Sequence, residues 1–599
     1  MNLKPAFLLA GLLGLAAAPA RAQWTTQSLA LKTGWNAVFL HVDAGHATLD
    51  QLVGAGAPVL TPIEEVWRWN PTVGIAQFID SPQEPTTAGT QWTAWRRADG
   101  PGSALQVLTA NTAYLVYATA DHTWELTGRP VLPAYDWSTS GLNFFGFPTV
   151  PAAPPSFEDF LFHAPALLAG QIYRYPGGDL GPGNPARVFA FRDTPVRRGE
   201  AYWLRAGDQF NEYFGPFAVT AAGTGAASFG DAGSGFSFRL RNLTAAPLTV
   251  NLTLRASAAP PAGQTPVVGV PPLLVRGEWN TTNLTYGHDP LPPGTPHVIT
   301  LAPRGQSGAE REVVIGLDRA NITAAVGELL AGVLELTDGL GLTRVDLGTS
   351  ATAASMAGLW VGTAAVTGVS QYLLQYLRDG GGNLVVEQDG SYAVSSITTN
   401  VTPVPVPFPL RLILHNPATG PAVLLQRVYV GLNAITNPVI ANGEAVLHPG
   451  LRADARRISA AHLPWTEAND GWDFSGPLAR AAVILATVAT PFNAHESNPF
   501  LHTYHPDHDT LDARFRNELP QGAESYRIVR EISLSVNPPA DHFASRVAAG
   551  LTLTGEYLET ARLEGLARAG GAFDTRRFAP TGEFEIHRLS EVPALTRVP

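Results

Sequence analysis

The stretch FSFRLRNLTAAPLTVNLTLRAS (Phe236–Ser257) decides the fold class of this 599-residue chain. Apolar and polar side chains alternate on both sides of Ala245–Pro247, a short break made of small residues and proline. Alternation with a period of two places the two sets of side chains on opposite faces of a β-strand, and a proline-containing break ends a strand. The stretch therefore predicts two half-buried strands separated by a turn.

The same pattern continues through residues 236–352. Ala331–Gly339 and Leu342–Ala351 both alternate, and the dipeptide Asp338-Gly339 near their junction is a typical hairpin turn. Short strands with such turns predict a β-sandwich. The segment is similar to the immunoglobulin-like spacers of bacterial envelope proteins, which hold other modules apart. The preceding run of small residues, 221–235, is predicted to be a flexible linker.

Composition agrees with a chain of strands and turns. It contains 59 Gly and 50 Pro, which favour turns over long helices, and 45% hydrophobic residues, enough for several buried cores. There is no Cys, which excludes disulfides, thiolate metal sites and cysteine nucleophiles. The net charge is −11 without a run of basic residues, so we expect no nucleic-acid partner.

Residues 1–22 have the three parts of a secretory signal peptide. Lys4 supplies a positive charge, Ala6–Ala18 is apolar or small, and Ala20–Ala22 fits cleavage before Gln23. The apolar run is too short for a membrane span, which needs about 20 residues. We expect a secreted, periplasmic or cell-surface protein with no transmembrane segment after cleavage.

Within residues 23–220 the same series of sequence features occurs twice in the same order, which indicates a duplication. The copies are predicted to be two β-rich units, 23–135 and 136–220. Matched positions are Gly34 and Gly141, Arg68 and Arg174, Tyr114 and Tyr202, and Gly128 and Gly215.

Both copies resemble a module of bacterial and archaeal surface proteins that opens with a Gly-Trp-Asn strand and closes with a Gly-x-Tyr-Trp strand. The opening is intact at Gly34–Asn36 and the closing at Tyr202–Trp203, while Leu142 and Leu115 stand in place of tryptophan in the other copy. The resemblance implies a secreted β-rich module and no reaction. Ser156 is expected to cap a short helix in the second copy.

Eight of the 13 Trp lie before residue 138, so the repeats are rich in aromatic rings. Strand alternation places neighbouring rings on one face. Such a face either fills a core or stacks against sugars as a ligand platform, and the sequence leaves both open. The candidate platform residues are Trp67, Trp69, Tyr173 and Tyr175.

Residues 353–599 are predicted to form a C-terminal antiparallel domain, either barrel-like or a sandwich. At least six strand-like segments occur, and the first, Gly358–Val369, can pair with the last, Gly582–Ser590. Val401–Pro409 (VTPVPVPFP) is predicted to be a proline-rich turn. The domain resembles the C-terminal module of large uncharacterised secreted proteins of environmental Gram-negative bacteria. That resemblance is carried by Gly358–Gly362, Pro407–Leu414, Asn498–Phe500, Tyr504–Asp509 and Gly555–Thr560.

The segment HESNPFLHTYHPDHDTLD (His495–Asp512) gathers histidines and aspartates. Neutral imidazoles with a carboxylate suit Zn²⁺, and carboxylate oxygens suit Ca²⁺, so a divalent metal is a candidate cofactor. The alternative is a packed loop whose side chains cap backbone N–H groups. The candidate metal ligands are His502, His505, His508, Asp507 and Asp509.

No motif of a reaction class occurs: there is no Gly-x-Ser-x-Gly and no Walker loop. We therefore expect an all-β, multidomain envelope or extracellular protein with a non-enzymatic binding or scaffolding role. Two alternatives stay open. The first is carbohydrate binding by the aromatic faces of the repeats, and the second is a metal-dependent hydrolase centred on the histidine-rich loop. Expected partners are cell-surface glycans or other envelope proteins.

Overall fold

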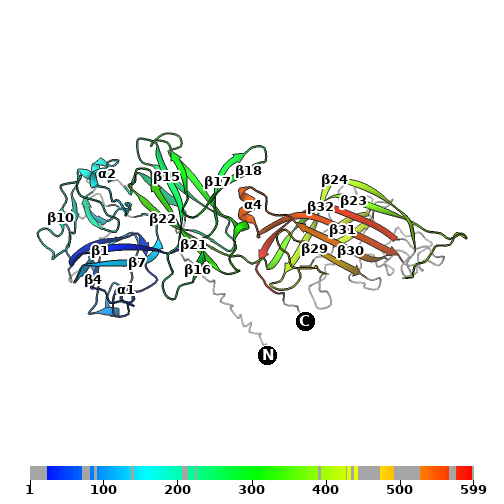
Figure 1. Ribbon diagram of the computed structural model, residues 1–599, viewed down its shortest axis with the longest axis horizontal. Coiled ribbons are helices and arrows are strands. Elements are labelled where there is room, and N and C mark those ends of the chain that lie inside the picture. The colour runs from blue at the N-terminus through cyan, green and yellow to red at the C-terminus, as the bar shows by residue number, and fades with distance from the viewer. Residues whose placement is uncertain are drawn as a thin grey trace, which may run out of the picture. The chain divides into compact units, whose positions relative to one another are not determined.

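The computed structural model describes residues 23–70, 81–86, 91–134, 137, 141–205, 213–222, 225–388, 393–425, 428–432, 438–442, 472–490, 526–565 and 575–595 (Figure 1). The fold is all-β and multidomain, as predicted, with a few short helices. The chain forms two compact units. One is Met1–Ala353 with His542–Val547, and the other is Ala354–Asp541 with Ala548–Pro599.

Each of the two predicted repeats contains a four-stranded antiparallel sheet, and the two sheets have the same strand order. In the first copy the order is β2 (Gly34–Leu40), β6 (Thr112–Ala118), β4 (Ile63–Trp69) and β5 (Trp92–Arg96). In the second it is β8 (Leu142–Phe145), β11 (Tyr202–Arg205), β9 (Ile172–Arg174) and β10 (Ala186–Arg187). The first copy adds a sheet of β1 (Thr25–Leu31), β7 (His122–Pro130) and β3 (Val42–Asp43).

Matched residues of the two copies make matched contacts. The Tyr114 hydroxyl accepts a hydrogen bond from the Thr109 N–H at 2.9 Å, and the Tyr202 hydroxyl accepts one from the Arg197 N–H at 3.0 Å. In both copies the bond reaches five residues back along the chain. This shared contact and the shared strand order support the duplication inferred from the sequence.

Short helices follow the first strands of each copy. In α1 (Leu49–Val53) the Thr48 side chain caps the first turn, and in α2 (Phe157–Phe160) the Ser156 side chain accepts from the Asp159 N–H, which confirms the predicted cap. A third helix, α3 (Pro165–Leu168), follows in the second copy.

The two copies share one core between their sheets. Buried side chains of the first copy, such as Phe39 and Leu115, pack with Phe145 and Trp203 of the second. Backbone bonds also join the copies, for example from the Phe39 N–H to the Gly199 carbonyl at 2.8 Å. Gly34 is required at this junction because a Cβ there would lie 2.4 Å from the Gly178 carbonyl oxygen.

The predicted sandwich consists of two sheets over a core of aliphatic and Phe side chains. One sheet has the order β12 (Phe217–Ala221), β14 (Gly235–Asn242), β20 (Glu310–Leu317), β17 (Leu273–Asn280) and β18 (Thr285–Leu291). The other has β13 (Ala227–Gly230), β22 (Arg344–Thr352), β21 (Leu329–Asp338), β15 (Leu248–Ala256) and β19 (Pro296–Leu301), with β16 (Val267–Gly269) on β21.

Two predictions for the sandwich have definite outcomes. The hairpin around Asp338 is confirmed, since β21 and β22 pair and the Asp338 carboxylate accepts from the Thr343 N–H at 2.6 Å. The linker expected at 221–235 is wrong over part of its length, because β13 and the start of β14 lie there. Strand β13 pairs in parallel with β22 and buries the Phe229 ring in the sandwich core, so these residues are not a flexible linker.

The second unit contains an eight-stranded antiparallel sheet. Its order is β28 (Trp472–Asp473), β25 (Val423–Leu424), β24 (Val394–Asn416), β23 (Gly358–Tyr376), β32 (Thr575–Ser590), β31 (Thr552–Gly565), β30 (Tyr526–Val536) and β29 (Val483–Thr490). A separate pair is formed by β26 (Val428–Leu432) and β27 (Pro438–Asn442).

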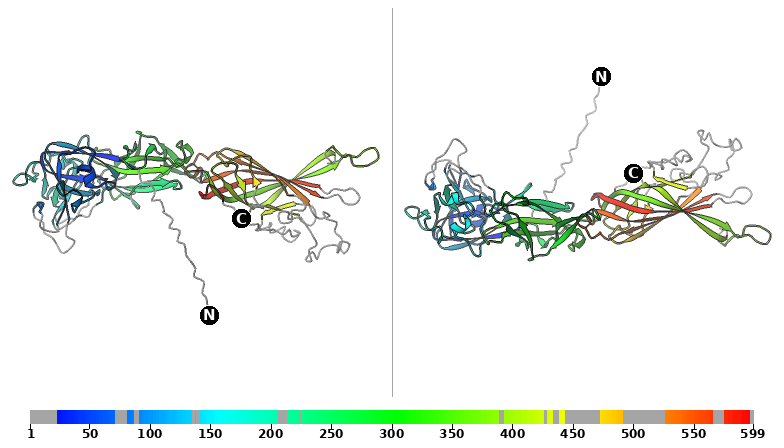
Figure 2. Two further views of the ribbon diagram at one scale, coloured as in Figure 1. Left: turned by 90° about the horizontal axis from the view of Figure 1, so that it is seen from below. Right: turned by 90° about the horizontal axis from the view of Figure 1, so that it is seen from above.

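The first and last long strands of this unit pair, as predicted, and β23 and β32 lie side by side in all views (Figure 2). The ends of the sheet also approach each other, since the Ser475 N–H after β28 donates to the Leu485 carbonyl of β29 at 2.7 Å. The sheet is therefore barrel-like, one of the two predicted alternatives.

The proline-rich turn predicted at Val401–Pro409 is wrong, because these residues lie inside β24. Proline cannot donate to a ladder and is tolerated in a strand only where one edge lacks a partner. On the side of β24 away from β23, the described strand β25 pairs only with Leu414 and His415.

Helix α4 (Phe543–Ala548) lies between β30 and β31 in sequence, yet Phe543 and Val547 belong to the first unit. They pack on Leu274 and Val314 of the sandwich. Within the described residues, none of the helices has the length and apolar character needed to cross a membrane.

Candidate functional site

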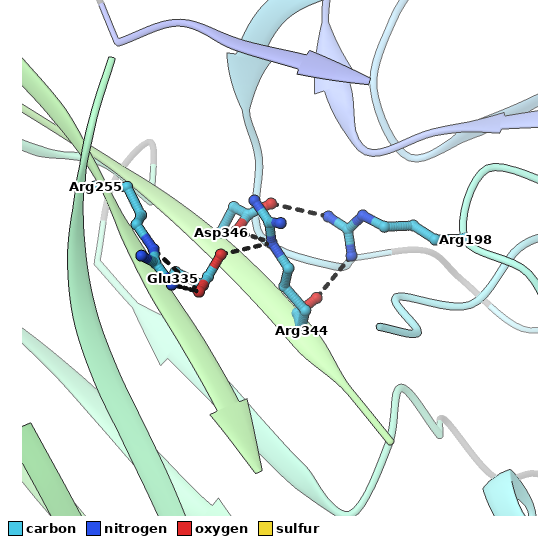
Figure 3. Close-up of polar contacts among 5 residues, drawn as sticks. All are labelled: Arg198, Arg255, Glu335, Arg344 and Asp346. Carbon is cyan, nitrogen blue, oxygen red and sulfur yellow. Dashed lines mark hydrogen bonds and ion pairs between the residues drawn. The ribbon is translucent and has the colours of Figure 1, made fainter. Parts of the chain in front are cut away.

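A chain of charged side chains, buried at Arg198 and Asp346 and exposed at Arg255, joins the second repeat to the sandwich (Figure 3). Arg198 comes from the turn before β11, and its guanidinium donates to the Arg344 carbonyl at 2.7 Å and to the Asp346 carboxylate at 3.0 Å. The side chains of Arg198 and Asp346 are only 12% and 6% exposed. We call the five residues of Figure 3 (Arg198, Arg255, Glu335, Arg344 and Asp346) the polar joint.

Strand register explains how the polar joint forms. Arg344 and Asp346 are two residues apart on β22, so they share one face, and Glu335 of β21 lies directly opposite Asp346. Arg344 Nε lies 2.8 Å from Asp346 and 3.2 Å from Glu335, and Arg255 of β15 lies 3.0 Å from Glu335. Cations and anions thus alternate along the cluster, which is how buried charges are compensated.

His41 lies beside the polar joint and is 4% exposed. Burial lowers the pKa of His41 well below its usual range, and the positive charge of Arg198 lowers it further. A hydrogen bond with the Phe147 backbone opposes this effect, and Arg344 adds to it. The imidazole is therefore neutral at neutral pH.

The residues after the predicted cleavage site reinforce the same junction. The Gln23 side chain donates to the Ser350 hydroxyl at 2.9 Å, and the Trp24 N–H donates to the Ser257 hydroxyl at 2.9 Å. The fully buried Trp24 ring contacts His46 of the first repeat and packs with Leu329 of the sandwich. The start of the expected mature chain therefore ties a repeat to the sandwich.

The contacts of the polar joint are those of a structural junction between two modules. The Arg198 and Asp346 side chains are nearly inaccessible to solvent, and every charge of the polar joint faces an opposite charge within the protein. Arginine also stays protonated throughout the physiological range, so it is a poor acid or base. The arrangement can hold two modules in one orientation.

The rings of the predicted platform lie in the core shared by the repeats. Trp67 is 4% exposed and Tyr175 is 9% exposed, and the Tyr175 hydroxyl accepts from the Trp203 indole N–H at 3.0 Å. Trp69 and Tyr173 are half-buried against the same core. Trp67 and Trp69 share a face as predicted, and this burial favours the core interpretation of that face.

An open hollow lies on the second repeat. It encloses about 380 Å³ between α2, the end of α3 and the segment after β10. Its lining includes Phe189, which is 76% exposed, and the ion pair of Arg192 Nε and Glu158 at 3.0 Å. The hollow combines apolar and charged surface, but both charges are already paired with each other.

The histidine-rich segment lies outside the described residues. The placement of His502, His505, His508, Asp507 and Asp509 is therefore not described, and the metal site stays a prediction. Within the described part of the chain, no cluster of three or more histidine, aspartate or glutamate side chains is close enough to hold a metal ion.

A buried ionic cluster in the second unit was not found from the sequence. Arg530 of β30 pairs with Glu559 of β31, and the Tyr557 hydroxyl donates to the same carboxylate. Glu556 is exposed and Glu559 is 2% exposed, so these two carboxylates lie on opposite faces of β31. The sequence signal for this cluster is Glu559, a charged residue that lies on the apolar face of β31.

Comparison with known proteins adds little to this geometry. No family model matches the sequence, and no curated protein matches it. Among solved structures the chain is similar to the CupB2 chaperone of Pseudomonas aeruginosa, with 9% identity, 37% of this chain and 98% of that chain covered, and a TM-score of 0.15.

Two further similar structures come from Bacteroides. One is a multidomain protein including DUF1735 from Bacteroides ovatus, with 9% identity, coverage of 61% and 91%, and a TM-score of 0.13. The other is an auxiliary nutrient binding protein from Bacteroides thetaiotaomicron, with 10% identity, coverage of 59% and 84%, and a TM-score of 0.12. TM-scores this low do not establish a shared fold.

Proposed function

We propose that the chain is an exported protein of the cell envelope or extracellular space that acts by binding and scaffolding. The observation that carries the proposal is the polar joint. Separate modules within a chain usually move relative to one another unless their interface is large or well fastened. Here buried ion pairs, the Trp24 contacts and the shared core of the repeats make three modules one rigid body.

Rigidity is useful to a protein that presents a surface at a fixed distance and angle. Fixing two modules in advance removes the entropy that flexible modules would lose on binding a partner. Export is supported by the signal peptide pattern and by the ordered contacts of Gln23 and Trp24, the first residues after the expected cleavage site.

The rigid body can be tested by distance measurement in the mature chain. Because the sequence has no Cys, a pair of introduced cysteines gives unique spin labels. We place them at the exposed positions Thr123 of β7 and Thr300 of β19, by Thr123→Cys and Thr300→Cys. One narrow distance distribution is expected, and Arg198→Met should broaden it. A broad distribution in the parent protein would contradict the proposal.

Export is tested separately by fractionating bacteria that produce the full chain. The processed protein should begin at Gln23 and lie outside the cytoplasm. Leu12→Arg with Leu13→Arg, which interrupts the apolar run, should leave the unprocessed chain in the cytoplasm. Processing of the parent chain at another site, or retention of the parent chain in the cytoplasm, would count against the proposal.

The hydrolase alternative stays a prediction with a direct test. Metal content of the purified mature chain is measured beside His505→Ala. Stoichiometric zinc or calcium that is lost in the variant would support a metal site in the histidine-rich loop. Absence of metal from the parent protein would end that alternative.

A further inference from the structure

The hairpin of β17 and β18 presents two aromatic rings to solvent. Trp279 is 46% exposed and Tyr286 is 39% exposed, and they lie directly opposite each other in the strand register. Their ring centroids are 4.8 Å apart with the planes at 66°. Since β18 is the edge strand of its sheet, these rings lie at the border of the sandwich and away from its core.

A β-bulge places the Trp279 ring there. The register between the two strands shifts between Arg276 and Trp279. Residues three apart on a regular strand point to opposite faces, but here Arg276 stacks on Tyr286 at 4.6 Å and Trp279 packs against the same ring. Bulges re-aim side chains in this way and are frequent beside functional sites. The bulge therefore turns a large apolar ring toward water.

The polar groups of this aromatic pair are available to a ligand. Neither the Trp279 indole N–H nor the Tyr286 hydroxyl has a hydrogen-bond partner among the described residues. Arg276 lies 3.5 Å from Glu312 of the neighbouring strand β20, so an ion pair flanks the rings. The surface offers apolar ring faces next to donors and acceptors, which is typical of sites that take amphipathic ligands.

The chemistry selects a class of ligand. The faces of aromatic rings carry partial negative charge and attract weakly positive C–H groups, which line one face of a pyranose, while its hydroxyls need donors and acceptors nearby. Arg276, which stacks on Tyr286, is already paired with the Glu312 carboxylate at 3.5 Å. The cation beside the rings is therefore already compensated, which disfavours anionic ligands and anionic lipid surfaces.

We infer that the Trp279–Tyr286 pair is a binding site for neutral polysaccharides. The inference rests on the proposed binding role and gives it a ligand class. It places the site on the sandwich hairpin, away from the repeats where aromatic residues are most frequent in the sequence. The rigid body that includes the repeats would then hold this site in a fixed orientation.

The inference is tested by electrophoresis of the mature chain, residues 23–599, through native gels. The gels contain hydroxyethyl cellulose, dextran or galactomannan as neutral probes, or alginate as an acidic probe. We expect retardation in at least one neutral gel and none in alginate. Trp279→Ala should weaken the affinity at least about tenfold, the effect of losing roughly 1.4 kcal/mol of stacking. Tyr286→Phe, which keeps the ring, should retain most of the affinity.

Two controls define the outcomes. Phe189→Ala removes an exposed ring on the second repeat and should leave retardation unchanged, and thermal unfolding of each variant shows that it is folded. No retardation in any neutral gel, or retardation that Trp279→Ala with Tyr286→Ala leaves intact, overturns the inference. Binding only to alginate or to phosphatidylglycerol vesicles also overturns it. None of these results bears on export or rigidity, so failure here is distinct from failure of the proposed function.

Discussion

The core rings of the repeats are buried, whereas the two rings of the sandwich hairpin are exposed to solvent, although both regions belong to one compact unit. Trp203 is fully buried between the repeats, stacked on Phe144 at 4.5 Å, while Trp279 stands 46% exposed on an edge hairpin. The repeats bury their rings because two sheets face each other over one core. The hairpin lies at the edge of its sheet, since β18 pairs only with β17 in the described part of the chain, and it carries a bulge.

The difference shows that aromatic density in a sequence does not locate the rings that are exposed to solvent. A ring is available to a ligand only where no other element covers it. Buried rings contribute to stability through their area and contacts, whereas exposed rings contribute little to stability and are free to contact other molecules. Mutations in the two regions should therefore have separable effects on folding and binding.

The largest effect is expected at Trp203. Replacement by Ala removes a buried ring and its hydrogen bond to Tyr175, and should lower the free energy of unfolding by about 3–5 kcal/mol. Trp279→Ala is the matched control and should cost less than about 1 kcal/mol. Denaturant unfolding of both variants checks this. Equal losses would break the comparison, because the two rings would then contribute alike to the fold.

The polar joint should give the next largest effect. Arg198→Met leaves Asp346 with Arg344 as its remaining partner and should cost about 2–3 kcal/mol, since part of a buried charge loses its compensation. Arg239→Met, which breaks the exposed pair with Glu310, should change the free energy of unfolding by no more than about 0.5 kcal/mol. A similar small change for Arg198→Met would mean that the joint does not fasten the modules.

Stability should depend on pH through His41. Its pKa is lowered in the folded protein, first by burial and then by Arg198, so the unfolded chain takes up a proton near pH 6.5 before the folded protein does. The free energy of unfolding should therefore fall as the pH drops below about 6.5, by up to ~1.4 kcal/mol per pH unit. His41→Gln should flatten this dependence between pH 6.5 and 5.

The control for this pH series is His297→Gln, on the edge strand β19 away from the joint. Unfolding midpoints are compared with the parent protein at each pH. A parent-like slope in His41→Gln would show that His41 does not titrate in this window.

The tyrosines of the two repeats should give smaller, matched effects. Tyr114→Phe and Tyr202→Phe each remove a hydroxyl that accepts a backbone N–H, at a cost of about 1 kcal/mol. Tyr202 should lose somewhat more, because its hydroxyl also donates to the Glu200 carboxylate at 3.0 Å, whereas the Tyr114 hydroxyl donates to the neutral Thr109 carbonyl at 3.4 Å. Thermal unfolding of both variants checks the pairing. A loss in only one copy would weaken the case that these positions are equivalent.

Much of the architecture follows from local patterns in the sequence. Alternation and turn residues predicted the sandwich strands and the Asp338 hairpin, and the Ser156 cap was predicted from residue type alone. The pairing of β23 with β32 was predicted because the first and last segments of a barrel meet. Each of these features depends only on the residues of one strand or helix, or on one neighbouring strand.

The errors and omissions involve contacts between distant elements. Strand β13 was taken for a linker because small residues look flexible until a neighbouring strand accepts them, and the prolines of β24 signal an open strand edge only once the sheet order is known. The polar joint pairs Arg198 with a residue 148 positions away, which no local pattern reveals. The exposure of Trp279 depends on a bulge at Gly277 and Glu278, and a glycine inside a strand can mark a bulge but does not reveal which ring it exposes.

Hydroxyl-radical footprinting of the native protein tests the central claim most directly, because oxidation of each ring reports its access to water. We expect strong labelling of Trp279 and Tyr286 and weak labelling of Trp67, Tyr175 and Trp203. Labelling of Trp67 and Tyr175 at the level of Trp279 would contradict the account, since the repeats would then expose an aromatic face that we describe as core.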